Sequence, residues 1–248
     1  MKTVTVSGVR GYLLLFSHMR AYTSLLGHIV GSHAEITGYS EMHLRLRDQR
    51  ALHKLAQQVA RRSQKNYRGR YVFDKLLHNH LDTRRKVLRR NDVYPLIMVR
   101  HPKETIESIL RLKARFIDHP GVAEQYYLQR LQQLRQVVQW CDGECLFIQG
   151  EALVDQTDRV LEKITQWLQL ESPLNSQYDR FQHTGKRRLG DSSEHIFAGK
   201  VLPMEARKRD DQDALDLDLG EISGAVAAYE AFLAFISGEV AADKTVFT

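Results

Sequence analysis

Short apolar runs alternate with longer amphipathic stretches along this chain. The runs are rich in β-branched or aromatic residues and short enough to predict strands that are buried on both faces. In the stretches between them, apolar residues recur at helical spacing, which predicts helices that cover those faces. The predicted strands are 12–16, 71–73, 96–99 and 146–148, and the predicted helices are 51–62, 125–140, 158–170 and 222–235. This alternation indicates an α/β fold with a central parallel sheet.

The length of the chain favours one domain. It has 248 residues, of which 43% are hydrophobic, and this is enough to bury a sizeable core. We expect a single domain over 1–248, with its core at about 12–203 and an acidic loop and helix at about 205–248. The acidic patch at 210–218 is expected to be a solvated loop, and the last residues are expected to be frayed.

The charge and the cysteines indicate which ligands and which cellular location to expect. Lys and Arg number 36 against 30 Asp and Glu, and the net charge of +6 suits an anionic ligand and also nucleic acid. The two cysteines, Cys141 and Cys145, have no second Cys or His pair at zinc spacing, so we expect reduced thiols and no metal site. No signal peptide is visible, and the longest apolar runs are shorter than the ~20 residues that cross a bilayer. These observations predict a cytoplasmic protein without a membrane span.

The segment 16–26 joins the first predicted strand to a helical pattern. Free backbone amides and the positive end of the helix dipole gather at such a turn, which favours an anion. Arg20 would add a forked donor, and Thr23 and Ser24 would add two hydroxyl donors. The turn has neither the Gly nor the Lys of a Walker-type loop. It therefore predicts a phosphate-binding turn, with an ordinary strand-to-helix connection as the alternative.

A second segment, 94–108, repeats the order of strand, turn and helix. Its strand ends in Arg100, whereas magnesium-dependent NTPases usually place an acidic metal ligand at the end of a comparable strand. Pro102 suits the first turn of the helix, and Ser108 follows on the side of the helix that faces Arg100. The segment predicts that a second oxyanion is bound directly, without a metal.

Together the two segments resemble sulfotransferases that use 3′-phosphoadenosine 5′-phosphosulfate (PAPS), above all those with Arg in the first loop, such as the tyrosylprotein and some carbohydrate enzymes. The resemblance implies a P-loop NTPase-like three-layer sandwich. It also implies that a loop of the type P-R-x-G-T-T-L holds the 5′-phosphosulfate and that a pattern of the type R-[DH]-P-R holds the 3′-phosphate. The first loop matches at Arg20, Thr23, Ser24 and Leu25, with Ala21 and Tyr22 between them as further cofactor-binding candidates, and the second pattern matches at Arg100, Pro102, Lys103 and Ser108. Tyr22 stands where the family has Gly, so a side chain must fit where bare backbone usually meets the ligand.

The same resemblance suggests the catalytic groups. The segment 31–41 looks like the family's stretch that ends in the catalytic base, which aligns with Glu41. As the base, Glu41 would need to be shielded enough for a raised pKa; the alternative is a surface Glu. Lys75 ends a predicted strand where the family often places a Lys near the bridging oxygen of the phosphosulfate, with a structural ion pair to a neighbour such as Asp74 as the alternative. His78 is a rival base, because cytosolic sulfotransferases use a His close after this Lys.

Two further stretches match loosely. The segment 145–154 is similar to a family strand and turn, with Gly150 in place of a Tyr that some members use against the nucleotide. The segment 183–193 looks like the basic loop that closes over the nucleotide, and there Lys186 is the candidate contact. No histidine pair has the H-E-x-x-H spacing, so solvated or core roles are expected for the other histidines.

The implied reaction is transfer of a sulfonyl group from PAPS to a hydroxyl, or to an amine, leaving adenosine 3′,5′-bisphosphate. No metal would be required, and the acceptor would be a small molecule, a glycan or a peptide. Two alternatives stay open. One is a small-molecule kinase on the same architecture, and the other is a nucleic-acid- or anion-binding protein without catalysis. The sequence leaves the oligomeric state open.

Overall fold

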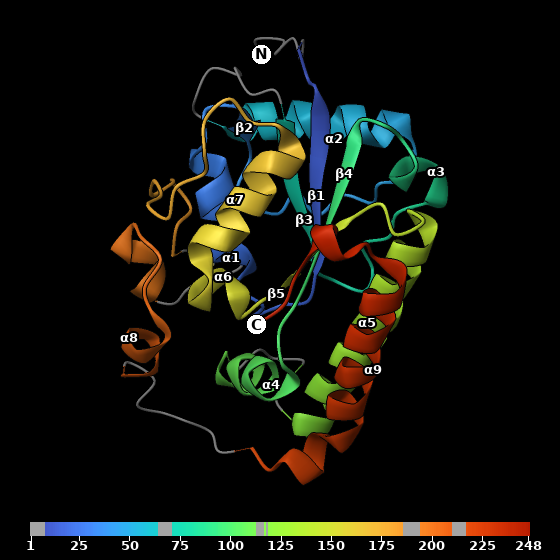
Figure 1. The fold of residues 1–248 in the computed structure, drawn as a ribbon, viewed down its shortest axis with the longest axis vertical. Helices are drawn as coiled ribbons and strands as arrows, with labels where there is room; N and C mark the ends of the chain where they lie inside the picture. Colours follow the sequence, from blue (N-terminus) through green and yellow to red (C-terminus); the bar gives the residue numbers. More distant parts are fainter. Residues whose placement is uncertain (1–7, 64–70, 113–116, 118, 186–193, 210–216) are drawn as a thin grey trace.

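A parallel sheet runs through the centre of the molecule (Figure 1). The computed structural model describes residues 8–63, 71–112, 117, 119–185, 194–209 and 217–248. Its six strands lie in the order β2-β3-β1-β4-β5-β6, and every neighbouring pair is parallel. The strands are β1 (Gly11–Ser17), β2 (Ile36–Thr37), β3 (Tyr71–Leu76), β4 (Val93–Val99), β5 (Leu146–Gln149) and β6 (Thr245–Val246). The predicted α/β fold with a parallel sheet is confirmed.

Helices cover both faces of the sheet. Side chains that alternate along β1 enter two separate cores, because successive residues of a strand point to opposite faces. Leu13 and Leu15 pack against α1 (Thr23–Ser32), α6 (Ala152–Asp155) and α7 (Thr157–Leu168). Leu14 and Phe16 belong to the core that contains α2 (Gln49–Arg62), α3 (Arg85–Leu88), α4 (Pro102–Arg111), α5 (Pro120–Trp140) and α9 (Ser223–Glu239). The remaining helices are α8 (Met204–Arg209) and the short 3₁₀ turns η1 (Glu194–Ala198), η2 (Leu219–Ile222) and η3 (Ala242–Lys244).

The two edge strands were not predicted. β2 and β6 each contain only two residues, too few to give an apolar run. The prediction that the last residues are frayed is wrong, because Thr245 and Val246 pair with Phe147 and Ile148 of β5. Val246 is fully buried beneath this edge of the sheet. The C-terminus therefore completes the core.

The last long helix also departs from the sequence analysis. By length and composition alone, the segment Leu219–Glu239 is apolar enough to cross a bilayer, with a mean hydropathy of 1.4. The sequence analysis considered only continuous apolar runs and did not single out this segment. In the structure Ala225, Tyr229, Phe232 and Ile236 are buried in the core, and α9 lies along α5 (Figure 1). The segment thus forms part of the helical layer of the domain.

The parallel order brings the carboxyl ends of β3, β1 and β4 side by side at one edge of the sheet. A buried arginine of α5 fastens this edge. Arg130 is only 2% exposed; its Nε donates to the carbonyl of Ser17 at 2.6 Å, and its Nη2 donates to the carbonyl of Leu76. These carbonyls close β1 and β3, so Arg130 fixes the point from which two loops of the candidate site begin.

Candidate active site

The turn between β1 and α1 has an unusual backbone. Arg20 and Tyr22 both lie in the left-handed region, with φ of 64° and 59°. This conformation costs a non-glycine residue roughly 1–2 kcal/mol, and such strain is concentrated at functional sites. Ala21 is fully buried, and Thr23 begins α1 with no side chain capping the helix. The amides at this helix end are therefore directed at the loop, where an anion would bind.

A buried histidine joins this turn to the loop after β4. His18 is fully buried, and its burial lowers its pKa to about 3, so the ring is neutral. Its Nδ1 donates to the carbonyl of Met19 at 2.9 Å, and its Nε2 accepts from the amide of Arg100 at 2.9 Å. One neutral tautomer satisfies both bonds. The sequence analysis missed this role because nothing in the local pattern distinguishes His18 from other histidines.

The two predicted phosphate-binding segments meet. Nε of Arg20 donates to Oγ of Ser108 at 2.8 Å, and Nη1 of Arg100 donates to the carbonyl of Arg20 at 3.2 Å. Residues from the end of β1, the end of β4 and the second turn of α4 thus form one cluster, which we call the arginine cluster: Arg20, Arg100 and Ser108. Pro102 occupies the first turn of α4, as predicted.

Arg100 has donors that the described residues leave unused. Its side chain is 13% exposed, and its Nε is buried without a hydrogen-bond partner. The nearest carboxylate is Glu151, whose Oε1 lies 4.0 Å from this Nε. Burial raises the pKa of Glu151, and its Oε2 is likewise buried without a partner. A buried guanidinium with an unused donor is suited to an anion that accepts hydrogen bonds.

Tyr22 packs against the same guanidinium. Its ring centroid lies 4.4 Å from Cζ of Arg100 and 5.5 Å from Cζ of Arg207, and its hydroxyl contacts Sδ of Met204 at 3.7 Å. The ring therefore extends from the turn toward α8. It is accommodated between two cations, which is a favourable environment for an aromatic face.

A second cluster gathers around Glu41. Oε1 of Glu41 lies 3.8 Å from Nζ of Lys75, which is 2% exposed at the end of β3. Oε2 lies 3.4 Å from Nε2 of His78 and 3.7 Å from Nδ1 of His43. Lys75 therefore forms an ion pair, as the alternative reading expected, but its partner is Glu41. Glu41 is 19% exposed, so its carboxylate is partly shielded from solvent.

The expected raised pKa of Glu41 is not found. Burial raises this pKa, but the proximity of His78, whose Nε2 lies 3.4 Å from Oε2, and the positive charge of Lys75 outweigh it, and the net pKa of Glu41 lies below its ordinary value. At Asp74 burial is the dominant effect, and it raises the pKa of this carboxyl to about 7 against the backbone hydrogen bonds that lower it. Oδ1 of Asp74 accepts from the amide of Met42 at 2.9 Å, which fixes the chain next to Glu41. The sequence analysis could not separate these two carboxyls, because their pKa values depend on distant partners.

Lys186 lies outside the described residues, so the predicted contact from the basic loop has no structural description. His78 and Glu41, predicted as rival bases, lie in contact with each other.

Ser24, predicted to bind the phosphate, lies in the first turn of α1, where its carbonyl accepts a hydrogen bond from Nδ1 of His28 at 2.7 Å.

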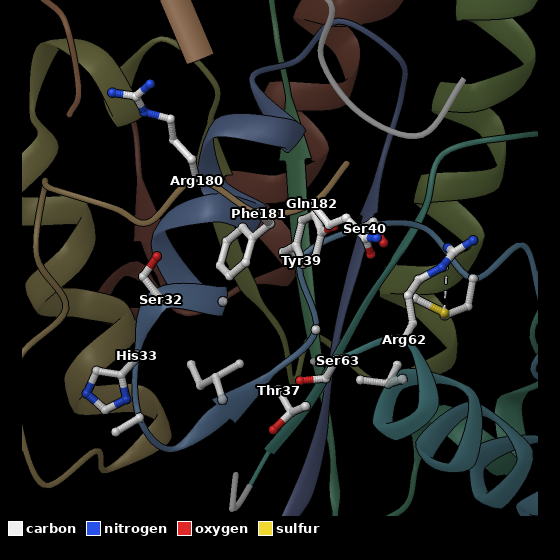
Figure 2. Close-up of a pocket in the computed structure, with 16 residues that line it drawn as sticks. Ser32, His33, Thr37, Tyr39, Ser40, Arg62, Ser63, Arg180, Phe181 and Gln182 are labelled. Carbon is white, nitrogen blue, oxygen red and sulfur yellow. Dashed lines mark hydrogen bonds between the residues drawn. The ribbon is translucent and has the colours of Figure 1, made fainter. Parts of the chain in front are cut away.

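A pocket lies next to the segment that carries Glu41, because Ser40 and Met42 line it (Figure 2). Its volume is about 670 Å³, and it lies between the ends of α1 and α2, β2 and residues 180–182. Tyr39 and Phe181 stack on its wall with ring centroids 4.1 Å apart. Ser40 and Met42 also line it, whereas the carboxylate of Glu41 is directed at Lys75. The sequence analysis did not predict this pocket, because its walls come from four separate segments.

Comparisons with known proteins define the fold. No protein-family model matches the chain, and no curated protein sequence matches it. Among solved structures, the sulfotransferase domain from the curacin biosynthetic pathway is similar with a TM-score of 0.55 at 17% identity, over 90% of this chain and 99% of that one. The sulfotransferase domain from the Synechococcus PCC 7002 olefin synthase has a TM-score of 0.55 at 16% identity, over 92% of this chain and 98% of that one. The chain has the fold of sulfotransferase domains.

Proposed function

We propose that this protein is a PAPS-dependent sulfotransferase that transfers a sulfonyl group to a hydroxyl or an amine. The observation that carries the proposal is the arginine cluster beside the pair of Glu41 and Lys75, all at the carboxyl ends of adjacent parallel strands. In open parallel sheets, ligands bind outside these ends. The likeness to sulfotransferase domains supports the same reading, because it places the chain on that fold.

The arginine cluster would hold the nucleotide. The turn amides at 20–24 and the guanidinium of Arg20 would bind the 5′-phosphosulfate, and Thr23 and Ser24 would add hydroxyl donors. Arg100 and Ser108 would bind the 3′-phosphate, which AMP and ATP lack. The unused Nε of Arg100 supports this role, because a phosphate oxygen would satisfy a donor that the protein leaves without an acceptor.

The Glu41 cluster would carry out the transfer. The acceptor oxygen or nitrogen attacks sulfur while the bond from sulfur to the bridging oxygen breaks, and that oxygen leaves with the electron pair as part of adenosine 3′,5′-bisphosphate. The acceptor proton passes to Glu41. Lys75 and Arg20 would stabilise the negative charge that builds up on the leaving oxygen.

The low pKa of Glu41 suggests how these steps are coupled. A carboxylate whose pKa is lowered by His78 and Lys75 is ionised but only weakly basic at neutral pH. When PAPS binds, Lys75 would also interact with the negatively charged phosphosulfate. Its stabilisation of the Glu41 carboxylate would then be weaker, and the pKa of Glu41 would rise. The base would then become stronger only when the donor is in place. His78, 3.4 Å from Oε2, is positioned to pass the proton on to solvent.

A thermal-shift measurement tests the proposal without knowledge of the acceptor. A ligand that binds only the folded state raises its stability. We expect adenosine 3′,5′-bisphosphate to raise the melting temperature at concentrations where AMP and magnesium-ATP have little effect. An equal response to all three nucleotides, or a response to magnesium-ATP alone, would refute the proposed donor. Salt-sensitive binding of oligonucleotides without a response to the bisphosphate would support a nucleic-acid-binding protein instead.

A further inference from the structure

Three potential metal ligands converge at the Glu41 cluster. The carboxylate of Glu41 and one ring nitrogen each of His43 and His78 all lie within 4.8 Å of one another, a grouping found among the residues that the structure describes. We propose that these three side chains bind a zinc-type divalent cation, and that the bound ion inhibits the enzyme. The inhibitory part rests on the proposed function, whereas the binding part does not.

The two distances from Glu41 to the histidines suit a tetrahedral ion. Zinc bonds of about 2.0–2.1 Å place neighbouring ligand atoms about 3.3 Å apart in a tetrahedron. Oε2 of Glu41 is already 3.4 Å from Nε2 of His78 and 3.7 Å from Nδ1 of His43. A fourth position would remain for water or for an acceptor molecule.

The Glu41 carboxylate has one oxygen next to Lys75 and the other directed at the two imidazoles, where a metal ion could bind. Oε1 of Glu41 faces Lys75, while Oε2 faces the two imidazoles and is buried without a hydrogen-bond partner. A metal on Oε2 would satisfy this atom and leave the pair with Lys75 in place. Two imidazoles and one carboxylate form a donor set that Zn²⁺ and similar transition metals prefer over Mg²⁺ or Ca²⁺.

The histidines are already held near the required arrangement. The rings of His43 and His78 stack with centroids 5.8 Å apart, and His80 stacks on His78 at 5.6 Å. Lys75 opposes the binding of a cation through its own positive charge, so the affinity would be lower than that of a structural zinc site. The sequence analysis missed this site because its ligands come from two separate loops, without a known zinc spacing.

Inhibition follows from the position of the ion. Lys75 contacts Oε1 of Glu41, so Oε2 is the oxygen that would take the proton from the acceptor molecule. A metal bound to Oε2 would use the lone pair that this proton needs. The ion would therefore compete with catalysis, and chelation would restore it. Sulfonyl transfer itself would still need no metal.

The test uses the full chain after treatment with EDTA and dialysis. Zn²⁺ is titrated in competition with a chromophoric chelator, against the wild type and the variants His43→Gln, Glu41→Gln and His53→Gln. His53 is an exposed histidine of α2 and serves as the matched control. We expect one equivalent to bind in the wild type, a loss of about 10-fold or more in affinity in the first two variants, and no change in the control. An excess of about tenfold Mg²⁺ should not displace the Zn²⁺, because Mg²⁺ prefers oxygen ligands in an octahedral arrangement.

A second readout keeps the result interpretable. Co²⁺ in place of Zn²⁺ should give the visible absorption of a tetrahedral site in the wild type but not in His43→Gln, and each variant should keep a cooperative thermal transition. Equal Zn²⁺ affinity in the wild type and His43→Gln would overturn the proposal. If Zn²⁺ binds as expected but adenosine 3′,5′-bisphosphate does not, the metal site stands and the proposed sulfotransferase function fails.

Discussion

Substitutions of Arg100 and of its neighbour Glu151 should change the affinity for adenosine 3′,5′-bisphosphate in opposite directions. In Arg100→Met the fork that would hold the 3′-phosphate is lost. Hydrogen bonds to charged groups contribute about 1.5–3 kcal/mol each. The variant loses two such hydrogen bonds, but it also avoids the cost of desolvating Arg100 when the ligand binds. We therefore expect binding of adenosine 3′,5′-bisphosphate to weaken by about 3 kcal/mol, or about 100-fold.

Glu151→Gln should have the reverse effect. The carboxylate of Glu151 lies 4.0 Å from Nε of Arg100 and competes with any anion for this donor. At that distance the attraction between two unit charges is about 1 kcal/mol in water and about 4 kcal/mol near a protein surface. Removing the charge should tighten bisphosphate binding about 5-fold or more. The new amide oxygen would still accept from the amide of His101, the bond that Oε1 makes at 2.9 Å.

Thermal shift and calorimetry measure both effects. With ligand at 100 times the wild-type Kd, the wild type gains about 2.7 kcal/mol, and a variant that binds 100-fold more weakly gains about 0.4 kcal/mol. For a chain of this size the shift in Tm should fall from about 5–10 °C to about 1 °C. AMP is the matched ligand control, because it lacks the 3′-phosphate and should bind Arg100→Met nearly as well as the wild type.

Two outcomes would refute this reasoning. If Arg100→Met lost affinity for AMP and the bisphosphate equally, Arg100 would be supporting the turn at Arg20, whose carbonyl it binds, and would not be reading the 3′-phosphate. If Glu151→Gln weakened bisphosphate binding, the carboxylate would be a part of the nucleotide site and not a competitor for it.

Three further predictions concern the framework. Arg130→Met leaves the carbonyls of Ser17 and Leu76 without this donor and should lower the free energy of unfolding by roughly 2–5 kcal/mol in urea; unchanged stability would show that water replaces the guanidinium. Gly38→Ala places a Cβ 2.4 Å from the carbonyl oxygen of Phe73 at a φ of +112° and should cost roughly 1–3 kcal/mol or more, whereas Gly220→Ala should stay within about 0.5 kcal/mol of the wild type. Asp74 holds a proton up to about pH 7 when folded but releases it near 3.8 when unfolded, so wild-type stability should fall as pH rises between these values. Asp74→Asn should remove this slope and be the more stable protein at pH 8, and a steeper slope in the variant would contradict the assignment.

The hydrophobic pattern was enough to predict the central strands and the long helices, because each of these buries several apolar residues. The edge strands depend on pairing with a neighbour, not on their own composition, and β6 consists of only Thr245 and Val246. The positions of Arg20 and Arg100 could be predicted for a similar reason. Parallel strands carry their carboxyl ends to one edge, so residues that follow two such strands must lie near each other.

The electrostatic state of the site could not be predicted in this way. The pKa of Glu41 depends on Lys75 and His78, which lie more than thirty residues along the chain, and on how closely they approach. The role of Arg130 depends on where the middle of α5 crosses two strands. His18 was assigned no role because its partners are backbone groups. In each case a long-range contact, not a local pattern, determines the chemistry.

The distribution of polar atoms without partners supports a ligand at this edge of the sheet. Buried polar groups in proteins almost always have a hydrogen-bond partner, and each one left without costs about 1–3 kcal/mol. Among the described residues, most of the buried side-chain atoms that lack one belong to segments at or next to the carboxyl ends of the strands: Ser40, Glu41, Asp74, Asn79, Arg100 and Glu151. They include both a guanidinium donor and carboxylate acceptors, so no single change of protonation state would satisfy them all. A phosphorylated nucleotide at Arg100 and a proton-bearing acceptor or a metal at Glu41 would each satisfy a different part of this set. The variant at position 100 therefore tests the proposed nucleotide site, and the variant at position 43 tests the proposed metal site next to it.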